Sequence, residues 1–195
     1  QLKSIVLSPD DFYYECNVLA TIACGKLYRK ECFMNVRYPE NKIHEDEFTT
    51  YKILFQYSGI SFVKAPLYSY FINENSITKS KWNPDRMLSI QAAEEQLDYF
   101  KKNGFTQAWR RRTESYVCVI ANQIECLKFY SGTNKKEYLR LLRKKLRQAL
   151  LKYRHQILFH NNKWIYEQAY PRIMYIYWIL AAQLGKLRRK RRCQN

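Results

Sequence analysis

From Asn83 onward, apolar residues recur at helical spacing, and this pattern limits the fold more than any other feature of the chain. The apolar positions of the first stretch are Met87, Ile90, Ala93, Leu97 and Phe100. Asn103 and Gly104 end that stretch, as residues that tolerate a left-handed backbone commonly do. Further helices are predicted over roughly 106–130, 135–154 and 163–190. The second half of the chain is therefore expected to be entirely helical.

The first 80 residues mix helix starts with short strand-like segments. Ser8 and Pro9 suit the cap and the first position of a helix that should run to about Ala20. Residues 60–63 and 67–72 are rich in β-branched and aromatic side chains, so each is predicted to be a strand. Two short strands cannot form a self-standing sheet, and this segment is therefore expected to be the end of a larger α/β domain.

These patterns give a fold class and two domains. Residues 1–80 are predicted to be an α/β remnant with few strands, and residues 81–195 a helical C-terminal region with a basic, amphipathic tail. The chain should be mostly α overall. Because Gln1 is not an initiator residue and the predicted sheet is incomplete, the sequence is expected to be part of a longer protein.

Net charge is concentrated in the C-terminal third of the chain. The whole sequence carries +17, and residues 131–195 hold 17 of its 34 Lys and Arg but only two of its 17 Asp and Glu. Such a one-sided field attracts polyanions, either nucleic acid or an anionic membrane surface. No recognised nucleic-acid module fits the sequence, so nucleic acid is not an expected partner.

An apolar, aromatic segment lies within this basic third. Residues 173–184 contain no charged side chain, and the seven residues from Lys186 onward add six basic ones. The apolar run is too short to cross a bilayer, which needs about 20 residues, but it suits the membrane interface. The predicted membrane contacts are Trp178, Lys186, Arg188 and Arg189. A core helix followed by a solvated tail explains the same pattern, and the sequence leaves both interpretations open.

The six cysteines form no C-x-x-C pair, and no nearby histidine completes a zinc-binding pattern. We expect them to be reduced and mostly buried, as small apolar residues of a cytosolic protein. They are Cys16, Cys24, Cys32, Cys118, Cys126 and Cys193.

The densest acidic feature is the run His44-Glu45-Asp46-Glu47, where a loop meets a predicted helix. A carboxylate at that point is held by backbone N–H groups and by the positive end of the helix dipole. Such a group at the mouth of a pocket can take a proton from a substrate hydroxyl. The same residue types also decorate ordinary first helical turns, so composition alone leaves both interpretations open.

Several motifs surround the acidic run in a fixed order. They are Gly25-Lys26-Leu27-Tyr28, Arg37-Tyr38-Pro39, Lys42-Ile43-His44-Glu45-Asp46-Glu47-Phe48, Leu67-Tyr68-Ser69-Tyr70 and Ser76-Ile77. This set resembles the second half of bacterial family 2 glycosyltransferases, above all those that build capsular, exo- and cell-wall polysaccharides. The resemblance is specific across about residues 20–80 and weaker in the helices after residue 84.

The resemblance implies a GT-A fold and an inverting transfer of sugar from a nucleotide-sugar donor to a saccharide or lipid-linked acceptor. The family's Glu-Asp pair falls on Glu45 and Asp46, so Asp46 is implied to be the general base that deprotonates the acceptor hydroxyl. Lys26 and Tyr28 would lie on the floor of the cleft, with Lys26 either facing the donor diphosphate or lying on the surface. The other implied substrate contacts are His44, Glu47 and Ser76. His44 is also interpretable as a structural neighbour of the helix start.

Two departures from the family pattern matter. The family's metal-binding Asp-x-Asp would precede Gln1, whereas Asp10 and Asp11 follow a helix-capping pattern. Mg²⁺ or Mn²⁺ is thus expected for the full-length enzyme, with no ligands in this chain, and the chain alone is expected to be inactive. Residues 71–75 also lack the arginines that relatives often carry before the equivalent of Ser76.

The expected partners are a nucleotide sugar and a saccharide or lipid-linked acceptor, with peripheral membrane contact and homo-oligomerisation left open. The expected location is the cytoplasm or the inner face of the cell membrane. The alternative, from a different class, is a non-catalytic basic helical module that binds a membrane surface or another polyanion.

Overall fold

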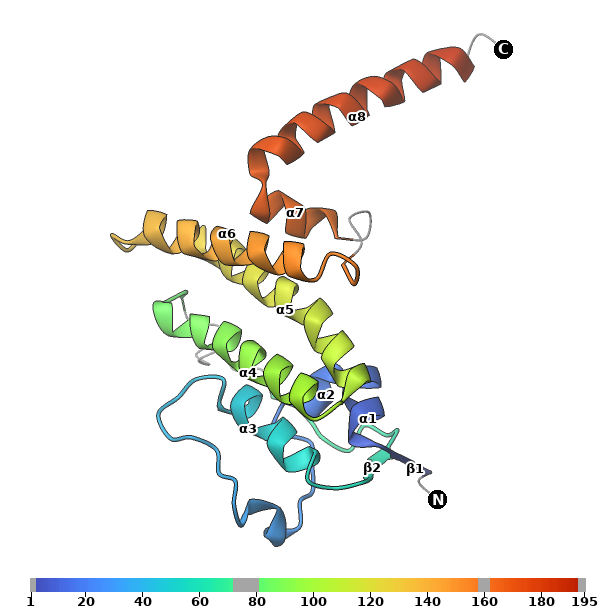
Figure 1. The fold of residues 1–195 in the computed structure, drawn as a ribbon, viewed down its shortest axis with the longest axis vertical. Coiled ribbons are helices and arrows are strands. Elements are labelled where there is room, and N and C mark those ends of the chain that lie inside the picture. The colour runs from blue at the N-terminus through green and yellow to red at the C-terminus, as the bar shows by residue number, and fades with distance from the viewer. Residues whose placement is uncertain (1–2, 72–80, 158–161, 193–195) are drawn as a thin grey trace.

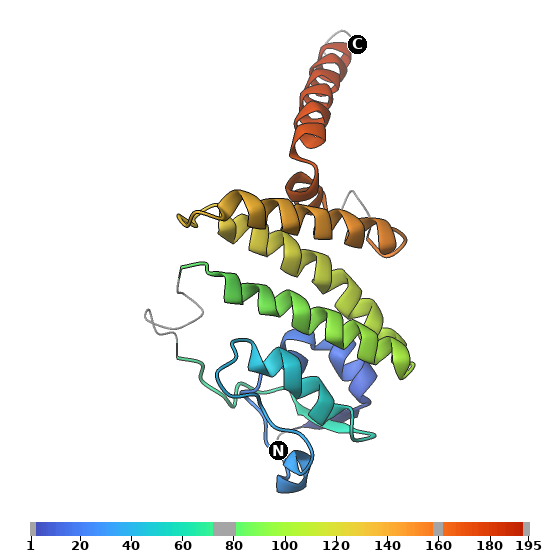
Figure 2. The ribbon, with the colours of Figure 1, turned by 60° about the vertical axis from the view of Figure 1, so that its left-hand side comes forward.

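The computed structural model describes residues 3–71, 81–157 and 162–192, with the backbone path alone for residues 183–192. Within these ranges the chain is mostly helical, as predicted. Its elements, in chain order, are β1 (Ser4–Leu7), α1 (Pro9–Glu15), α2 (Asn17–Thr21), η1 (Lys30–Phe33), α3 (Glu45–Leu54), β2 (Ile60–Val63), η3 (Pro84–Met87), α4 (Leu88–Lys102), α5 (Thr106–Leu127), α6 (Lys135–Lys152), α7 (Lys163–Ala169) and α8 (Pro171–Arg192). Figures 1 and 2 show β1, β2 and α1 to α3 at one end, α4 and α5 across the middle, and α6 to α8 toward the other end.

In the described part of the chain, the sheet consists of β1 and β2 alone. β2 forms where it was predicted, and it pairs antiparallel with β1, so that Ser4 lies opposite Val63. Gly59 lies close to β1, since a Cβ there would stand 3.0 Å from Cγ1 of Val6. The sequence did not predict β1, because its pairing with β2 depends on contacts made only in three dimensions.

The second predicted strand, at residues 67–72, is wrong over its described part. Residues 67–71 have no regular structure, and Leu67 and Phe71 are exposed. The chain enters this segment through a tight turn, in which the N–H of Leu67 donates to the carbonyl of Ala65 at 2.9 Å. Pro66 has no N–H to offer to a neighbouring strand. The aromatic side chains that suggested a strand therefore have no sheet to pack on.

Two predicted helices are each divided in two. The helix expected from Ser8 to about Ala20 is α1 followed by α2, because Cys16 leaves the helical region at φ −123 and ψ 41. The helix expected over 163–190 is α7 followed by α8, and the break lies where Tyr170 precedes Pro171. The predicted cap of α1 is confirmed, since the Ser8 hydroxyl oxygen accepts from the N–H of Asp11 at 3.1 Å.

Asp10 caps a second helix, far away in the sequence. Its carboxylate oxygens accept from the N–H of Ala108 at 2.7 Å and from that of Gln107 at 3.2 Å. The residue before α5, Phe105, has no side-chain cap to offer. The first turn of α1 therefore supplies the anion that the N-terminus of α5 requires.

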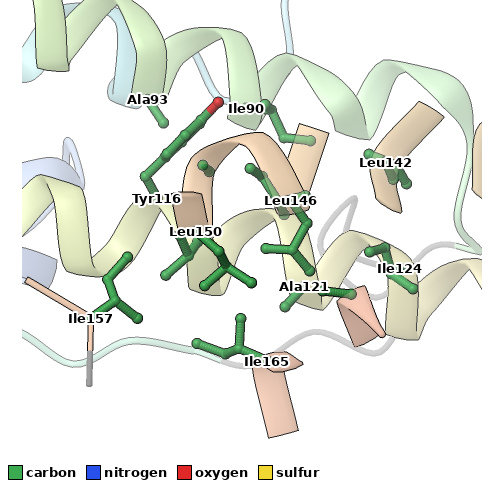
Figure 3. Packing of buried hydrophobic residues seen from close by; sticks show 14 of the residues in the cluster. Ile90, Ala93, Tyr116, Ala121, Ile124, Leu142, Leu146, Leu150, Ile157 and Ile165 are labelled. Atoms are coloured by element: carbon green, nitrogen blue, oxygen red, sulfur yellow. The ribbon is translucent and has the colours of Figure 1, made fainter. Parts of the chain in front are cut away.

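Among the described residues, two hydrophobic clusters form the core. The first is built from α4, α5, α6 and α7, and Figure 3 shows Leu146 and Leu150 facing Ala121 and Ile165 within it. The second joins residues from both sides of position 80: Phe12, Tyr13, Ala20, Tyr51, Leu54, Phe55, Phe100 and Ala108. The described residues before and after position 80 therefore pack against each other through a common core.

The cysteines are less buried than expected. Cys32 is buried, Cys16, Cys24 and Cys118 are half-buried, and Cys126 is exposed. All five are free thiols, and Cys193 lies outside the described residues. The prediction that they are mostly buried is wrong: Cys24 lies outside any helix, and Cys118 and Cys126 lie on α5 but are not among its buried residues.

Candidate functional site

The acidic run opens α3, as predicted. The helix begins at Glu45, with Glu45, Asp46 and Glu47 all in its first turn, and Phe55 caps its C-terminus four residues before Gly59. His44 precedes the helix in the left-handed conformation at φ 61, which turns the chain sharply from the preceding loop into α3. Three carboxylates are thereby placed at the positive end of the helix dipole.

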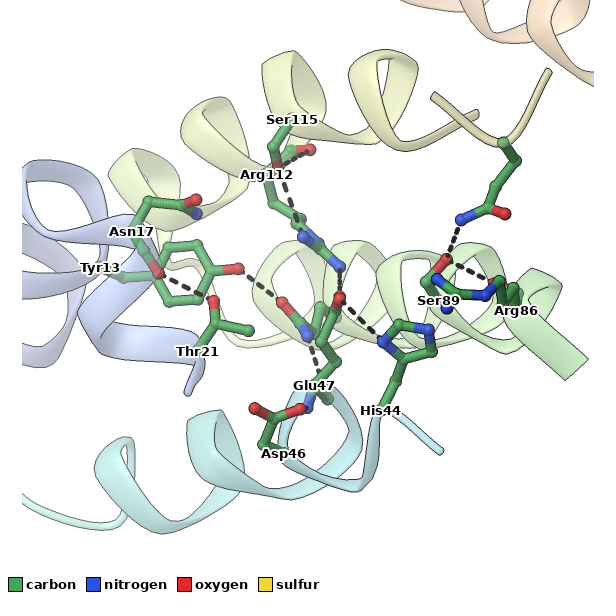
Figure 4. A network of polar contacts seen from close by, with 12 residues as sticks. Tyr13, Asn17, Thr21, His44, Asp46, Glu47, Arg86, Ser89, Arg112 and Ser115 are labelled. Carbon is green, nitrogen blue, oxygen red and sulfur yellow. Dashed lines mark hydrogen bonds and ion pairs between the residues drawn. The ribbon is translucent and has the colours of Figure 1, made fainter. Parts of the chain in front are cut away.

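Glu47 is held by an arginine from the helical region. Nη2 of Arg112, on α5, lies 2.6 Å from Oε2 of Glu47, and the two side chains are only 4% and 17% exposed. The other carboxylate oxygen of Glu47 lies 3.9 Å from Nδ1 of His44. Figure 4 shows the Glu47 side chain between these two partners. Both predicted substrate contacts are thus engaged with the protein itself.

A second link fixes the backbone of the same turn. Nε2 of the buried Gln96, on α4, donates to the carbonyl of Glu47, and the Tyr13 hydroxyl donates to Oε1 of Gln96 at 2.5 Å. Burial raises the pKa of Tyr13, so its hydroxyl stays protonated and remains a donor. Because a buried amide needs partners for both of its ends, this chain from α1 through α4 holds α3 in a defined position.

Asp46 is arranged differently from Glu47. It is half-buried, and its Oδ1 accepts from the N–H of Glu47 at 2.8 Å. In Figure 4 its carboxylate points away from Arg112. A carboxylate that accepts one backbone hydrogen bond keeps further lone pairs for another donor. Glu45, also half-buried, occupies the first position of the helix.

Lys26 lies within electrostatic reach of Asp46. Burial lowers the pKa of Lys26, and the charge on Asp46 is among the influences that oppose this shift. The Lys26 ammonium donates to the carbonyl of Ile22 and, at 3.4 Å, to that of Cys24. Gly25, between Cys24 and Lys26, has φ 69, a conformation that favours glycine. Lys26 is half-buried.

Tyr28 and the loop after it pack near α3 through aromatic and hydroxyl contacts. The Tyr28 ring packs edge-on against Phe33 with their centroids 5.3 Å apart, and burial, together with neighbouring Tyr38, raises its pKa. Tyr38 in turn shares a hydrogen bond of 3.1 Å with the Thr50 hydroxyl of α3. The motif residues Lys26, Tyr28 and Asp46 are thus brought to one part of the molecule, and Ser76 lies outside the described residues.

The predicted membrane contacts lie elsewhere. Trp178 is on α8, which Figure 1 shows at the opposite end of the molecule from α3. Lys186, Arg188 and Arg189 lie on the same helix, where the backbone path alone is described. Over the described ranges, no helix is both long and apolar enough to cross a membrane.

The described residues do not fit a Mg²⁺ or Mn²⁺ site. Within 3–71, 81–157 and 162–192, no group of three or more His, Cys, Asp or Glu side chains is placed to hold a metal ion. Asp10 and Asp11, the early acidic pair, are both engaged at helix N-termini. No chemical step is therefore assigned to a metal bound by these residues.

A cleft of about 330 Å³ opens between α4, α5 and α6, away from α3. Within it the Tyr116 hydroxyl and the Lys145 ammonium each lie 2.5 Å from Oε1 of Glu94. This ion pair bridges two helix surfaces and satisfies the Glu94 carboxylate. The cleft contains none of the motif residues of the α3 region.

The sequence did not identify Arg112, Gln96 or Tyr13 as parts of this site. Arg112 belongs to the run Arg110-Arg111-Arg112, which has the composition of a solvated surface. A signal was present nonetheless, since Arg112 lies four residues from both Ala108 and Tyr116 and so shares their buried face. A charged residue in register with an apolar stripe indicates a buried partner.

No protein-family model matches the chain, and neither a curated protein nor a solved structure matches it significantly.

Proposed function

We propose that the chain is the acceptor side of an inverting, nucleotide-sugar-dependent glycosyltransferase, in which Asp46 is the general base. The observation that supports this is the difference between neighbouring carboxylates in the first turn of α3. Glu47 is paired with Arg112, whereas Asp46 accepts a backbone hydrogen bond and its carboxylate points away from that arginine. The resemblance of residues 20–80 to family 2 glycosyltransferases assigns the base to the same residue.

In the proposed reaction, a hydroxyl of the saccharide or lipid-linked acceptor donates a hydrogen bond to the Asp46 carboxylate. As the acceptor oxygen bonds to the anomeric carbon, its proton passes to Asp46. The bond from the anomeric carbon to the diphosphate oxygen breaks on the opposite face, and the nucleoside diphosphate leaves with that electron pair. One displacement of this kind inverts the anomeric configuration, and Asp46 later releases its proton to water.

The surrounding residues position Asp46 in this scheme and hold charge near it. Arg112 and Gln96 fix the first turn of α3 through Glu47, so the Asp46 backbone has little freedom to drift from the acceptor. Lys26 contributes a partly desolvated positive charge on the same side. Such a charge stabilises an anionic donor more strongly than an exposed lysine would.

The stereochemistry of the product tests the proposal. The full-length protein is incubated with a panel of α-linked nucleotide sugars and extracted lipid-linked or saccharide acceptors, and the anomeric proton of the product is observed by NMR. A β-linked product is expected. An α-linked product would require two displacements or a different mechanism, and it would remove the role of Asp46 as the single base.

A second candidate is binding without catalysis by the basic helical region. The concentration of positive charge in residues 131–195 favours it. The two candidates are separable, because replacing Asp46 abolishes transfer under the first and changes no binding property under the second.

A further inference from the structure

Helix α8 exposes an apolar surface that no described part of the chain covers. In both views α8 extends away from the body formed by α1 to α7, and it packs against α7 (Figures 1 and 2). Large apolar side chains along it are between 42% and 68% exposed: Ile173, Tyr175, Ile176, Trp178, Ile179 and Leu180. Soluble proteins rarely expose so continuous an apolar stretch, because contact between apolar side chains and water is unfavourable.

The six exposed residues surround most of the helix except its Met174 side, and three of them form one continuous face. Ile173, Ile176 and Leu180 are spaced by three and four residues, so their side chains follow one another along the same face. Met174, by contrast, is only 4% exposed, and its N–H donates to the carbonyl of Tyr170 at 3.0 Å. The helix thus uses the Met174 side to attach to the body and presents the isoleucine and leucine face outward.

Trp178 also contacts α7. Its indole N–H donates to Oε1 of Glu167, on α7, at 2.7 Å. The Lys163 ammonium lies 5.4 Å from the centroid of the same ring. These contacts orient α8 relative to α7. The outward contact surface is therefore centred on Ile176 and Leu180 instead of on Trp178.

The net positive charge of α8 indicates what kind of surface it would bind. Residues 171–192 contain seven Lys and Arg and no Asp or Glu, and six of the seven follow the apolar part directly, from Lys186 onward. An apolar face of about three turns followed by a basic run matches the two layers of an anionic membrane surface. A nucleic acid would complement the charge but would leave the isoleucines in water.

We propose that α8 is an interfacial helix that binds an anionic lipid bilayer. Ile173, Ile176 and Leu180 enter the boundary between headgroups and acyl chains, and the basic run remains among the anionic headgroups. The apolar stretch at residues 173–184 is about 18 Å long as a helix, against about 30 Å for the hydrocarbon core, so it lies along the surface. The proposal does not depend on Asp46 or on sugar transfer.

Vesicle sedimentation tests the proposal with the purified protein. Wild type is expected to bind phosphatidylcholine vesicles that contain phosphatidylglycerol, and to bind phosphatidylcholine alone weakly. The double variant Ile176→Ser, Leu180→Ser should lose binding by roughly tenfold or more, because two apolar side chains no longer enter the bilayer. The matched control is Leu141→Ser, Leu151→Ser, which removes two exposed leucines from the basic helix α6 and should bind like wild type.

Several outcomes would overturn the proposal. The first is that the Ile176, Leu180 variant binds anionic vesicles as well as wild type does. The second is that wild type binds vesicles equally well with and without phosphatidylglycerol. The third is that the α6 control variant loses vesicle binding. A concentration-dependent dimer that the α8 variant abolishes, without vesicle binding by wild type, would make the surface an interface between two copies. The substituted side chains are all exposed, so each variant is expected to fold. Circular dichroism checks this and separates the outcomes above from misfolding.

Discussion

At the scale of single residues, the most consequential contact joins Arg112 to Glu47. It buries two charges that attract each other, and each would be costly alone in the interior. The pair could not be read from the sequence, because the two residues are 65 positions apart and each belongs to a charged run. The place of Asp46 in the first turn of α3, in contrast, could be predicted, since it depends on local helix signals. The choice of Asp46 over Glu45 and Glu47 came from the family resemblance.

Replacing Arg112 with Met should destabilise the fold substantially. Glu47 would be left as a largely buried charge without its main partner, which costs about 3–5 kcal/mol in the free energy of unfolding. Urea denaturation followed by circular dichroism measures the change. Arg110→Met is the matched control, because that side chain is 59% exposed and its loss should change stability by less than about 0.5 kcal/mol. Equal effects of the two substitutions would show that the Arg112–Glu47 pair is not buried in solution.

At the scale of secondary-structure elements, helices were predictable and strand pairing was not. The stripes of α4, α5 and α6 have a period that one sequence reveals, so their positions agree with the prediction within a few residues. β1 and residues 67–71 show where the prediction of strands from the sequence fails. Pairing depends on which segment reaches β2 in three dimensions, and composition does not carry that information. The division of α7 from α8 follows from Pro171, a local signal that the prediction overlooked.

The cap that Asp10 places on α5 connects elements that are distant in sequence. Asp10→Ala should lower the free energy of unfolding by about 0.5–2 kcal/mol, because the N–H groups of Gln107 and Ala108 lose their acceptor. Thermal or urea unfolding measures this loss. Asp98→Ala, at an exposed position inside α4, is the control and should be nearly neutral. No loss for Asp10→Ala would mean that water replaces the cap at no cost.

At the scale of the whole molecule, one core couples the two predicted domains. Phe100 and Ala108 pack with Phe12, Tyr51 and Phe55, so the helical region also completes the core beneath the α3 site. A boundary near residue 80 was predicted from the change in pattern, and both described strands precede it. The packing across it depends on shape complementarity between side chains, which one sequence does not reveal.

Buried tyrosines distributed through this core should make the fold sensitive to alkali. Burial raises the pKa of Tyr13, Tyr28, Tyr51 and Tyr116 above the ordinary value near 10. The unfolded chain therefore loses protons that the folded chain keeps, and stability falls as pH rises above about 10. The slope should be at most about 1.4 kcal/mol per pH unit for each such tyrosine. Lys26 acts in the opposite direction, since its lowered pKa stabilises the fold as pH rises toward 10.5.

Urea unfolding at a series of pH values measures that slope. Tyr51→Phe keeps the buried ring and removes one ionisable hydroxyl, so it should make the decline above about pH 10.5 shallower. Tyr175→Phe is the control, because that side chain is 68% exposed and stays in water in both states. An unchanged slope in the Tyr51 variant would place that hydroxyl in contact with solvent.

The most direct test of the assignment of Asp46 is the kcat for sugar transfer by the full-length protein carrying Asp46→Asn. The substitution keeps the size of the side chain and removes its ability to accept a proton. We predict a fall in kcat of about 10²–10⁴-fold, with a KM for the donor that changes little, because the base acts in the transition state. Asp98→Asn, at an exposed position on α4, should retain wild-type kcat. Wild-type kcat in the Asp46→Asn protein would contradict the assignment of Asp46 as the general base.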